Sequence, residues 1–333
     1  MTNNQRKKCT ILLIFSLALI ISLSGCSALS AKKVSKSTFV LNTVATITLF
    51  DGSDEAIIDS CFDLCREYEA LLSRTVEDSD ISKLNRRETE TVSDATAKLI
   101  AAGLHYSALT GGAFDISVEP ISSLWDFGSE THSVPDAAVL AAAAKQVDYR
   151  SVLQVGNKIT FSSPDTRLDL GAIAKGYIAD KMKEFLISQG VKSAIINLGG
   201  NVLCIGGKTA KAGFDVAILR PFESSAIATL TVSDCSVVTS GVYERCFEEN
   251  GVLYHHLLDT ETGLPIDNGL LSVTIISKNS VDGDALSTAC FALGPEEGME
   301  LIKTLPDTYA VFITSDYELH LSPGLEASYK ITY

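Results

Sequence analysis

The sequence predicts an α+β protein in which mixed sheets carry packed helices. Helical and strand patterns do not alternate as they do in a parallel βαβ fold, and between residues 194 and 276 strand-like segments follow one another directly. The 333 residues are enough to bury a large core, either in one big domain or in two intertwined ones.

The expected helices are defined by apolar residues at helical spacing and by signals at their ends. Ser93 is a typical N-cap, and Gly111 and Gly112 are typical of a helix end. Pro135 precedes an alanine-rich helix, and Gly190 ends another. We expect helices over residues 54–72, 93–110, 136–145, 174–188, 285–293 and 296–305.

The expected strands are short, and their apolar residues alternate with polar ones or form brief runs. The first covers residues 39–50, and residues 73–85 form a polar connection between two helices. Further strands are expected over residues 152–155, 159–161, 168–170, 194–198, 202–205, 214–219, 227–232, 237–239, 252–258, 271–276, 309–314 and 319–321.

The N-terminus has the features of a bacterial secretion signal. Three basic residues at positions 6–8 precede an apolar run over residues 11–23, which is shorter than the roughly 20 residues of a membrane span. Ser24, Gly25 and Cys26 follow, and this ending resembles the lipobox, in which the cysteine is lipidated. An uncleaved anchor or an ordinary signal peptide is the alternative.

These features divide the chain into three parts. We expect a lipoprotein signal peptide over residues 1–25, a tether over residues 26–37 that begins with the lipidated Cys26, and a catalytic domain over residues 38–333. The protein is then a lipoprotein held at the cell membrane, on its extracytoplasmic face, by acyl chains that each contribute about 0.8 kcal/mol per buried CH₂.

The charge and the cysteines exclude several classes of function. The formal net charge is −14, which argues against binding nucleic acid or anionic lipid by charge, so the lipid has to hold the protein at the membrane. The eight cysteines include no Cys-x-x-Cys pair, so a zinc or redox motif is not expected. Disulfides are possible outside the cytoplasm, and the sequence selects no pairing.

Two glycine-containing segments suggest ligand binding. Gly111 and Gly112 permit close approach of a ligand, and the nearby Phe114 and Trp125 offer flat faces to an aromatic heterocycle; a helix end followed by a buried loop is the alternative. Residues 168–177 place Asp169 and Lys175 where a strand meets a helix, which favours an anion, although a tight connection would look similar.

A third glycine pair lies within the sequence Asn197-Leu-Gly-Gly-Asn201, between two apolar strands. It suggests a bulge or a backbone pressed against a ligand.

The last segments suggest a cation site. Asp284 and Thr288 are four residues apart on an expected helix and share one face, where a carboxylate and a hydroxyl suit Mg²⁺. Capping of that helix by Asp282 or Asp284 is the alternative. His255 and His256 are neighbours on an expected strand, so one of them can face a site and the other cannot.

Together these motifs resemble the ApbE-type FAD:protein FMN transferases. The matching motifs are Gly112-Ala-Phe-Asp115 with Leu-Trp-x-Phe-Gly, Asp169-Leu-Gly-Ala-Ile-Ala-Lys-Gly, Asn-Leu-Gly-Gly, Thr-Ser-Gly-x-Tyr-Glu-Arg, His256-x-x-Asp-x-x-Thr-Gly and Asp284-x-x-x-Thr288. They occur in the family's order over roughly residues 39–315. The resemblance implies a two-lobed single catalytic unit related to the T-fold.

The resemblance also implies roles for individual residues. The implied contacts to FAD are Leu41, Thr75, Ala113, Phe114, Asp115, Asp169, Lys175 and Leu258. The implied metal ligands are the Ala172 carbonyl and the side chains of Asp284 and Thr288, and the implied active-site strand carries His256 and Asp259.

Two positions depart from the family's pattern. Leu41-Asn42-Thr43 stands where members commonly have Met-Gly-Thr, and Asn42 is bulkier than glycine. Thr75 stands where many members have tyrosine and cannot stack on a ring, which affects FAD affinity or the balance between transfer and hydrolysis.

The chemistry implied by the resemblance is phosphoryl transfer. A Ser or Thr hydroxyl of an acceptor flavoprotein attacks the FMN-side phosphorus of the substrate FAD, AMP leaves, and Mg²⁺ neutralises the diphosphate. His256 is the candidate to take the hydroxyl proton, with Asp259 as the alternative. The implied partner is a membrane-associated acceptor flavoprotein of an electron-transfer system. A hydrolase that cleaves FAD to FMN and AMP, and a non-catalytic flavin-binding lipoprotein, remain as alternatives.

Overall fold

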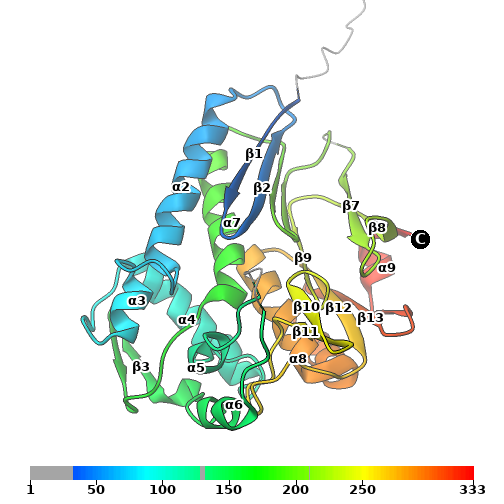
Figure 1. Cartoon of the computed structure of the whole chain (residues 1–333). Coiled ribbons are helices and arrows are strands. Elements are labelled where there is room, and N and C mark those ends of the chain that lie inside the picture. Colours follow the sequence, from blue (N-terminus) through cyan, green and yellow to red (C-terminus); the bar gives the residue numbers. More distant parts are fainter. Residues whose placement is uncertain (1–32, 128–131, 210) are drawn as a thin grey trace, which may run out of the picture.

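The computed structural model describes residues 33–127, 132–209 and 211–333 (Figure 1). The expected signal peptide, the lipidation site at Cys26 and the first residues of the tether therefore lie outside the described residues. In the part of the chain that is described, no helix has the length and apolar character needed to cross a membrane.

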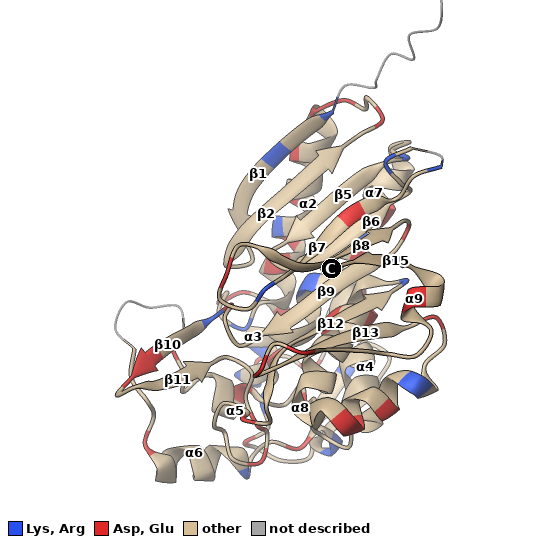
Figure 2. Cartoon of the chain, turned by 90° about the vertical axis from the view of Figure 1, so that its right-hand side faces the viewer, with Lys and Arg blue, Asp and Glu red and all other residues tan. Residues whose placement is uncertain are grey.

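An eight-stranded sheet forms the centre of the molecule, and all its neighbouring strands are antiparallel (Figure 2). Its order is β1 (Val34–Val40), β2 (Thr43–Leu49), β5 (Ala194–Leu198), β6 (Asn201–Ile205), β9 (Ser236–Gly241), β12 (Leu270–Ser277), β13 (Tyr309–Thr314) and β14 (Leu319–Leu321). An antiparallel sheet with helices on one face confirms the predicted α+β class.

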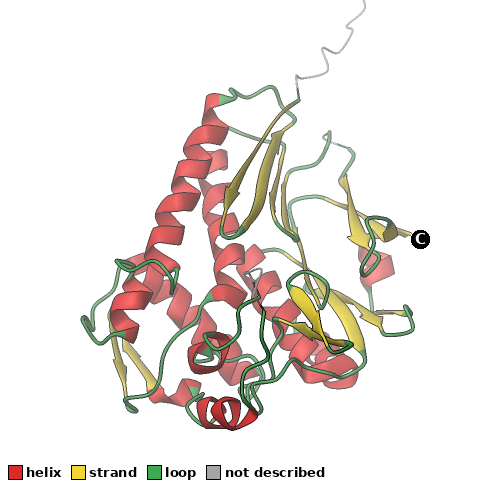
Figure 3. Ribbon diagram, viewed as in Figure 1, coloured by secondary structure: helices red, strands yellow, loops and turns green. Residues whose placement is uncertain are grey.

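Helices cover one face of this sheet (Figure 3). They are α2 (Ala56–Leu72), α4 (Asp94–Leu109), α7 (Gly171–Ser188) and α8 (Ser280–Thr304). The main core lies between these helices and the sheet, where residues such as Phe62 of α2, Ile178 of α7 and Ile47 of β2 are buried. Cys61 and Cys65 are buried in the same core as free thiols, so they serve as packing residues.

A small sheet covers the opposite face. It has the order β15 (Lys330–Thr332), β8 (Ala226–Val232) and β7 (Phe214–Leu219), and its apolar side chains form a second core with β9, β12 and β13. The short helix α9 (Leu325–Ser328) contributes Leu325 to this core.

A third cluster forms a separate lobe below the main sheet in Figure 1. It joins α5 (Glu119–Ser122) and α6 (Ala137–Ala144) to the hairpin of β10 (Cys246–Glu249) and β11 (Val252–His255). The remaining elements are α3 (Asp80–Asn85), the 3₁₀ turn Tyr149–Ser151, β3 (Val152–Val155) and β4 (Lys158–Phe161). The polar connection expected over residues 73–85 thus contains a short helix, whose N-cap is Ser79.

The beginning of the domain differs from the prediction. The single strand expected over residues 39–50 is a hairpin, because Leu41 and Asn42 both have φ near 53° and turn the chain between β1 and β2. Asparagine adopts this left-handed conformation more readily than most residues, so it can replace a glycine here. Residues 34–37 already belong to β1, so the expected tether is too long by these four residues.

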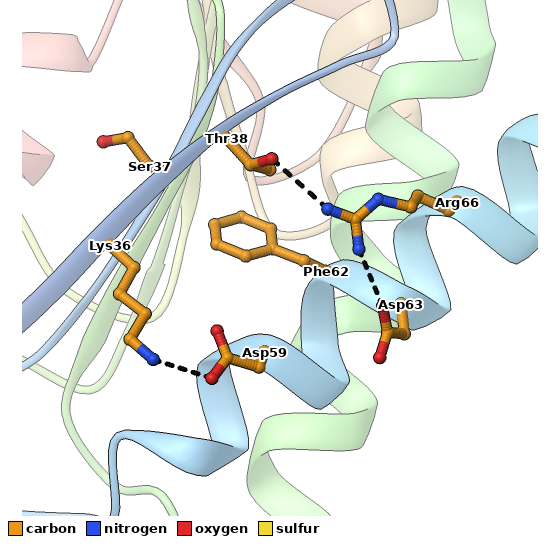
Figure 4. A pocket seen from close by; sticks show the side chains of 7 residues that line it. All are labelled: Lys36, Ser37, Thr38, Asp59, Phe62, Asp63 and Arg66. Carbon is orange, nitrogen blue, oxygen red and sulfur yellow. Dashed lines mark hydrogen bonds and ion pairs between the residues drawn. The ribbon is translucent and has the colours of Figure 1, made fainter.

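Strand β1 is attached to helix α2 by polar contacts around a hollow (Figure 4). Lys36 donates to Asp59 at 2.7 Å, and Arg66 contacts Asp63 at 2.7 Å and Thr38 at 3.3 Å. The residues that line the hollow include none of the predicted site residues. The polar contacts around the hollow hold the edge strand β1 against α2.

Two helices begin earlier than predicted. Helix α7 begins at Gly171 rather than at residue 174, and the strand expected over residues 168–170 is absent from this described region. Helix α8 begins at Ser280 rather than at residue 285 and continues past Gly294, whose φ of 83° interrupts it. Because of these earlier starts, residues 171–173 and Asp284 of the motifs that suggested ligand binding lie within helices.

Candidate functional site

Helices α7 and α8 meet face to face, and this contact organises the site. On α7, Gly176 and Asp180 lie one turn apart; on α8, Ser280 and Asp284 do the same. Asp180 accepts the Ser280 N–H at 2.8 Å, and the Gly176 N–H donates to Asp284 at 2.8 Å. The two helices therefore run antiparallel, with these positions paired.

The same spacing predicts the next pair. Ala172 lies one turn before Gly176, and Thr288 lies one turn after Asp284, so the antiparallel arrangement brings Ala172 toward Thr288. The three predicted metal ligands therefore belong to one line of helix–helix contact, which we call the α7–α8 seam (Ala172, Gly176 and Asp180 facing Ser280, Asp284 and Thr288).

Gly176 allows the helices to come this close. A Cβ at this position would lie 2.7 Å from the Cβ of Asp284 and 2.6 Å from the carbonyl carbon of Ser280. Two backbones approach so closely only where the side chain is a hydrogen atom. The glycine of the Ala-Lys-Gly motif is thus required by packing.

Asp284 is buried, with 5% of its surface exposed. Burial raises the pKa of its carboxyl group, and the positive charge of Lys175 and the Gly176 N–H oppose this shift. The alternative that Asp284 caps α8 is not supported, because Asp284 lies inside the helix and its carboxylate binds α7. A buried carboxylate next to a lysine is suited to holding a cation and a phosphate together.

The donor set of the seam fits Mg²⁺. A backbone carbonyl has two lone pairs, so the Ala172 carbonyl can bind a cation from within helix α7. Thr288 presents a hydroxyl that lies 3.3 Å from the Ser240 hydroxyl. A carboxylate, a carbonyl and a hydroxyl are hard oxygen donors of the kind that Mg²⁺ binds together with water and phosphate.

The N-terminus of α7 is held by Asp169. This carboxylate accepts the Gly171 N–H at 2.9 Å, the Arg74 Nε–H at 2.8 Å and the Ser122 hydroxyl at 2.6 Å. It therefore ties the loop after α2 and helix α5 to the start of α7, whose backbone N–H groups favour an anion. Sequence reasoning missed Arg74 and Ser122, because both lie outside the motifs.

Strand β11 leads into the site through His256. Its N–H donates to the Arg245 carbonyl at 3.1 Å. Burial, together with the charges of Arg245 and Lys175, lowers the pKa of His256 to about 3. The ring is therefore neutral near pH 7, and its Nδ1 is buried with no hydrogen-bond partner among the described residues.

His255 points the other way. Its ring is buried against Phe291, and Nε2 lies 3.1 Å from the Ile266 carbonyl. His255 therefore packs in the core, and of the two neighbouring histidines His256 is the one whose pKa the Lys175 charge lowers.

Glu244 is a second acid near the seam that sequence reasoning did not select. Desolvation by the surrounding protein raises the pKa of Glu244 to about 7, with a smaller contribution from the charge of Asp284, against the lowering effects of Lys175 and Arg245. The Thr-Ser-Gly-x-Tyr-Glu-Arg motif contained the signal that could have identified it.

The Asn-Leu-Gly-Gly segment forms the turn between β5 and β6. Gly199 and Gly200 have φ of 61° and 86°, which replaces the expected mid-sheet bulge with a hairpin turn. A Cβ at Gly199 would lie 2.8 Å from the Cβ of Thr43, and a Cβ at Gly200 would lie 2.8 Å from Glu244 Oε1. The turn therefore brings β2 and Glu244 together beside the seam.

A second group of predicted residues lines a separate hollow that includes Ala113, Asp115 and Asp259. Asp115 accepts the N–H groups of Ser117 at 2.7 Å and Tyr149 at 2.9 Å, so its carboxylate holds the loop. Asp259 likewise accepts two N–H groups of the following turn at 2.8 Å. Through these contacts Asp259 shapes the turn that follows it.

The two aromatic residues of the first motif are not open to a ligand. Phe114 and Trp125 are 3% and 5% exposed. Trp125 stacks on Phe127, and its indole N–H donates to the Gly263 carbonyl at 2.9 Å. The expectation that these rings offer free faces to a heterocycle is therefore wrong, since they pack against protein.

The remaining predicted FAD contacts are Leu41, Thr75 and Leu258. Leu41, in the β1–β2 turn, donates its N–H to Glu69 of α2 at 2.9 Å. Thr75 is exposed in the loop that Arg74 joins to Asp169, and Leu258 pairs with Pro265 just after β11. Leu41 and Thr75 therefore flank the end of α2, and Leu258 follows His256.

The fold and the seam define an α+β protein in which a helix N-terminus, a lysine and a buried acid lie on two facing helices. The chain belongs to the ApbE family, whose model matches residues 41–313.

Curated relatives and solved structures agree with this assignment. The chain is 39% identical to an FAD:protein FMN transferase of Klebsiella pneumoniae, over 81% of this chain and 85% of that protein. It is 33% identical to an FAD:protein FMN transferase of Treponema pallidum, over 88% of each chain. Among solved structures, it resembles the ApbE protein of Thermotoga maritima, with a TM-score of 0.81 and 29% identity over 89% of this chain and 99% of that one. The flavin transferase ApbE of Vibrio cholerae gives a TM-score of 0.80 and 26% identity over the same shares.

Proposed function

We propose that this protein is an FAD:protein FMN transferase that moves FMN from FAD to a Ser or Thr hydroxyl of another protein and releases AMP. The observation that supports the proposal is the α7–α8 seam, where Asp284 accepts the Gly176 N–H and feels the charge of Lys175. Helix spacing directs Ala172 and Thr288 toward the same line of contact. Phosphoryl transfer depends mainly on charge neutralisation and in-line placement, and this seam supplies groups for both.

A cation at the seam would be held by Asp284, Thr288 and the Ala172 carbonyl. Bound there, Mg²⁺ would supply Lewis-acid stabilisation of the diphosphate. Lys175 and the N–H groups at the start of α7 bind the same phosphates, and Asp169 keeps that helix end in place through Arg74 and Gly171.

The proton of the acceptor hydroxyl is assigned to His256. Its ring is neutral near pH 7, as a proton acceptor must be, and its buried Nδ1 has no hydrogen-bond partner among the described residues. Asp259, the other candidate, has its Oδ1 engaged by two backbone N–H groups. Ala113 and Asp115, in the neighbouring loop, are proposed to contact the flavin part of FAD.

The proposed place of action is the outer face of the cell membrane. This rests on the sequence alone, which offers Cys26 for lipidation after a signal peptide. A lipid-anchored enzyme meets acceptors beside the same membrane, so we propose a membrane-associated flavoprotein of an electron-transfer system as the acceptor.

A second candidate, hydrolysis of FAD to FMN and AMP, is favoured by one observation. Thr75 is exposed where many members have tyrosine, and a small side chain leaves room for water. Incubation of the purified protein with FAD, Mg²⁺ and a candidate acceptor separates the two. Protein-bound FMN with AMP supports transfer; free FMN with AMP supports hydrolysis; unchanged FAD in the presence of a proven acceptor contradicts both and leaves a binding protein.

A further inference from the structure

We propose that Asp180 is a positioning residue for the cation site and fixes helix α8 so that Asp284 and Thr288 face the Ala172 carbonyl. The inference rests on the proposed function, because it concerns the cation that would serve the same reaction. Asp180 does not contact that cation itself; it lies two turns of α7 away from Ala172.

The contacts of Asp180 are directed at the first turn of α8. Its Oδ1 accepts the Ser280 N–H at 2.8 Å, and its Oδ2 accepts the Val281 N–H at 2.9 Å. The first N–H groups of a helix lack partners within the helix and need an acceptor from elsewhere. Here the acceptor belongs to another helix, so the cap also joins α8 to α7.

The usual local cap is engaged elsewhere. Asn279 precedes α8, and its side chain donates to Asp282 at 2.9 Å. Asp282 also accepts the Tyr106 hydroxyl at 2.7 Å, which ties the same turn to α4. Asp180 therefore holds the start of α8 to helix α7, and Tyr106 holds it to helix α4.

This arrangement fixes the position of α8 along α7. Asp180 and Ser280 form the first pair of the seam, Gly176 and Asp284 the second, and each pair is one turn from the next. Because two N–H groups bond two oxygens of one carboxylate, a slide of α8 along α7 breaks both bonds at once. The carboxylate of Asp284 is held in place by a contact one turn away.

Stability alone does not account for an acid at this partly buried position. Burial raises the pKa of Asp180 to about 6, so holding it ionised has a cost that a neutral cap would avoid. Each oxygen of the Asp180 carboxylate accepts one N–H group, so the rigid carboxylate fixes both bonds in one geometry.

The test compares Asp180→Asn with Tyr106→Phe. The asparagine variant replaces one acceptor oxygen with an NH₂ group that opposes an N–H, and the phenylalanine variant removes the other tether of the same turn. Mn²⁺ serves as the probe, and its binding in the presence of FAD is followed by electron paramagnetic resonance. The thermal unfolding midpoint of each variant is measured in parallel.

We expect Asp180→Asn to weaken Mn²⁺ binding about 10-fold or more, as is typical when the partner of a metal-binding group is lost. The rate of FMN transfer by Asp180→Asn should then recover as the Mg²⁺ concentration is raised, and its maximal value should be near that of the wild type. Tyr106→Phe should lower the unfolding midpoint while Mn²⁺ binding stays unchanged.

Unchanged Mn²⁺ binding in Asp180→Asn would overturn the proposal, and so would equal weakening in both variants, which would indicate a general loss of stability. If Asp180→Asn does not fold, Asp180→Ser, which keeps one acceptor oxygen, is judged by the same criteria. Because wild-type Mn²⁺ binding is measured without an acceptor, failure of the transfer assay and failure of this proposal remain separate results.

Discussion

Replacing Gly176 with alanine tests the geometry of the seam. The added Cβ would lie 2.6 Å from the Ser280 carbonyl carbon and 2.7 Å from the Asp284 Cβ, whereas ordinary contacts begin at 3.4 Å. Both neighbours are fixed by the backbone of α8, so the helices have to separate by about 1 Å. Overpacking of this kind costs about 1–3 kcal/mol of unfolding free energy.

The separation should affect activity more than stability. It moves Asp284 away from the Gly176 N–H and from the Ala172 carbonyl, and a misplacement of about 1 Å near the reacting groups can lower a rate about 100-fold. We therefore expect Gly176→Ala to fold, to lose about 1–3 kcal/mol in urea unfolding, and to release AMP from FAD about 100-fold more slowly.

Gly156→Ala is the matched control. Gly156 lies in the β3–β4 turn, with φ of 60° and nothing within 4 Å of an added Cβ. Alanine there costs about 1 kcal/mol through backbone strain alone, and the rate of AMP release should not change. Wild-type rate and stability in Gly176→Ala would refute the close contact of α7 and α8.

Three further predictions concern single side chains. Asp284→Ala should abolish transfer while thermal unfolding stays cooperative, because it removes the buried charge that holds the cation; full activity would exclude Asp284 as a ligand. The ring of His256 should stay neutral from pH 5 to pH 8 in ¹⁵N nuclear magnetic resonance, since its pKa is lowered to about 3. Because this folded-state pKa lies below the ordinary 6.5, the contribution of His256 to the free energy of unfolding should fall as the pH drops below about 6.5. A titration midpoint of the ring near pH 6.5 would contradict its burial. Arg74→Ala should weaken FAD binding about tenfold in calorimetry, since it removes the charged hydrogen bond that holds Asp169 at the start of α7; unchanged affinity would show that Ser122 and Gly171 suffice.

The sequence predicted the helices well where their ends carry polar or glycine signals. Ser93 caps α4, and Gly190 follows the end of α7, as expected. The starts of α7 and α8 were misplaced because their caps are not local. Leu170 cannot cap α7 with its side chain, and the acceptor for α8 is Asp180, 100 residues away in the sequence.

The candidate site was predictable in its residue types but not in its contacts. The spacing of Asp284 and Thr288 placed both on one helix face, and the structure keeps them there. Spacing does not reveal that Gly176 is pressed against Asp284, or that Phe114 and Trp125 are covered by protein. Those facts depend on how separate elements pack, which no local pattern records.

A crystal structure with FAD and Mn²⁺, in which the anomalous signal locates the cation, tests the proposed cation site most directly. We expect a peak at the seam next to Asp284, Thr288 and the Ala172 carbonyl, with the FAD diphosphate next to Lys175. A peak elsewhere in the protein, or FAD bound with its diphosphate away from the start of α7, would contradict it.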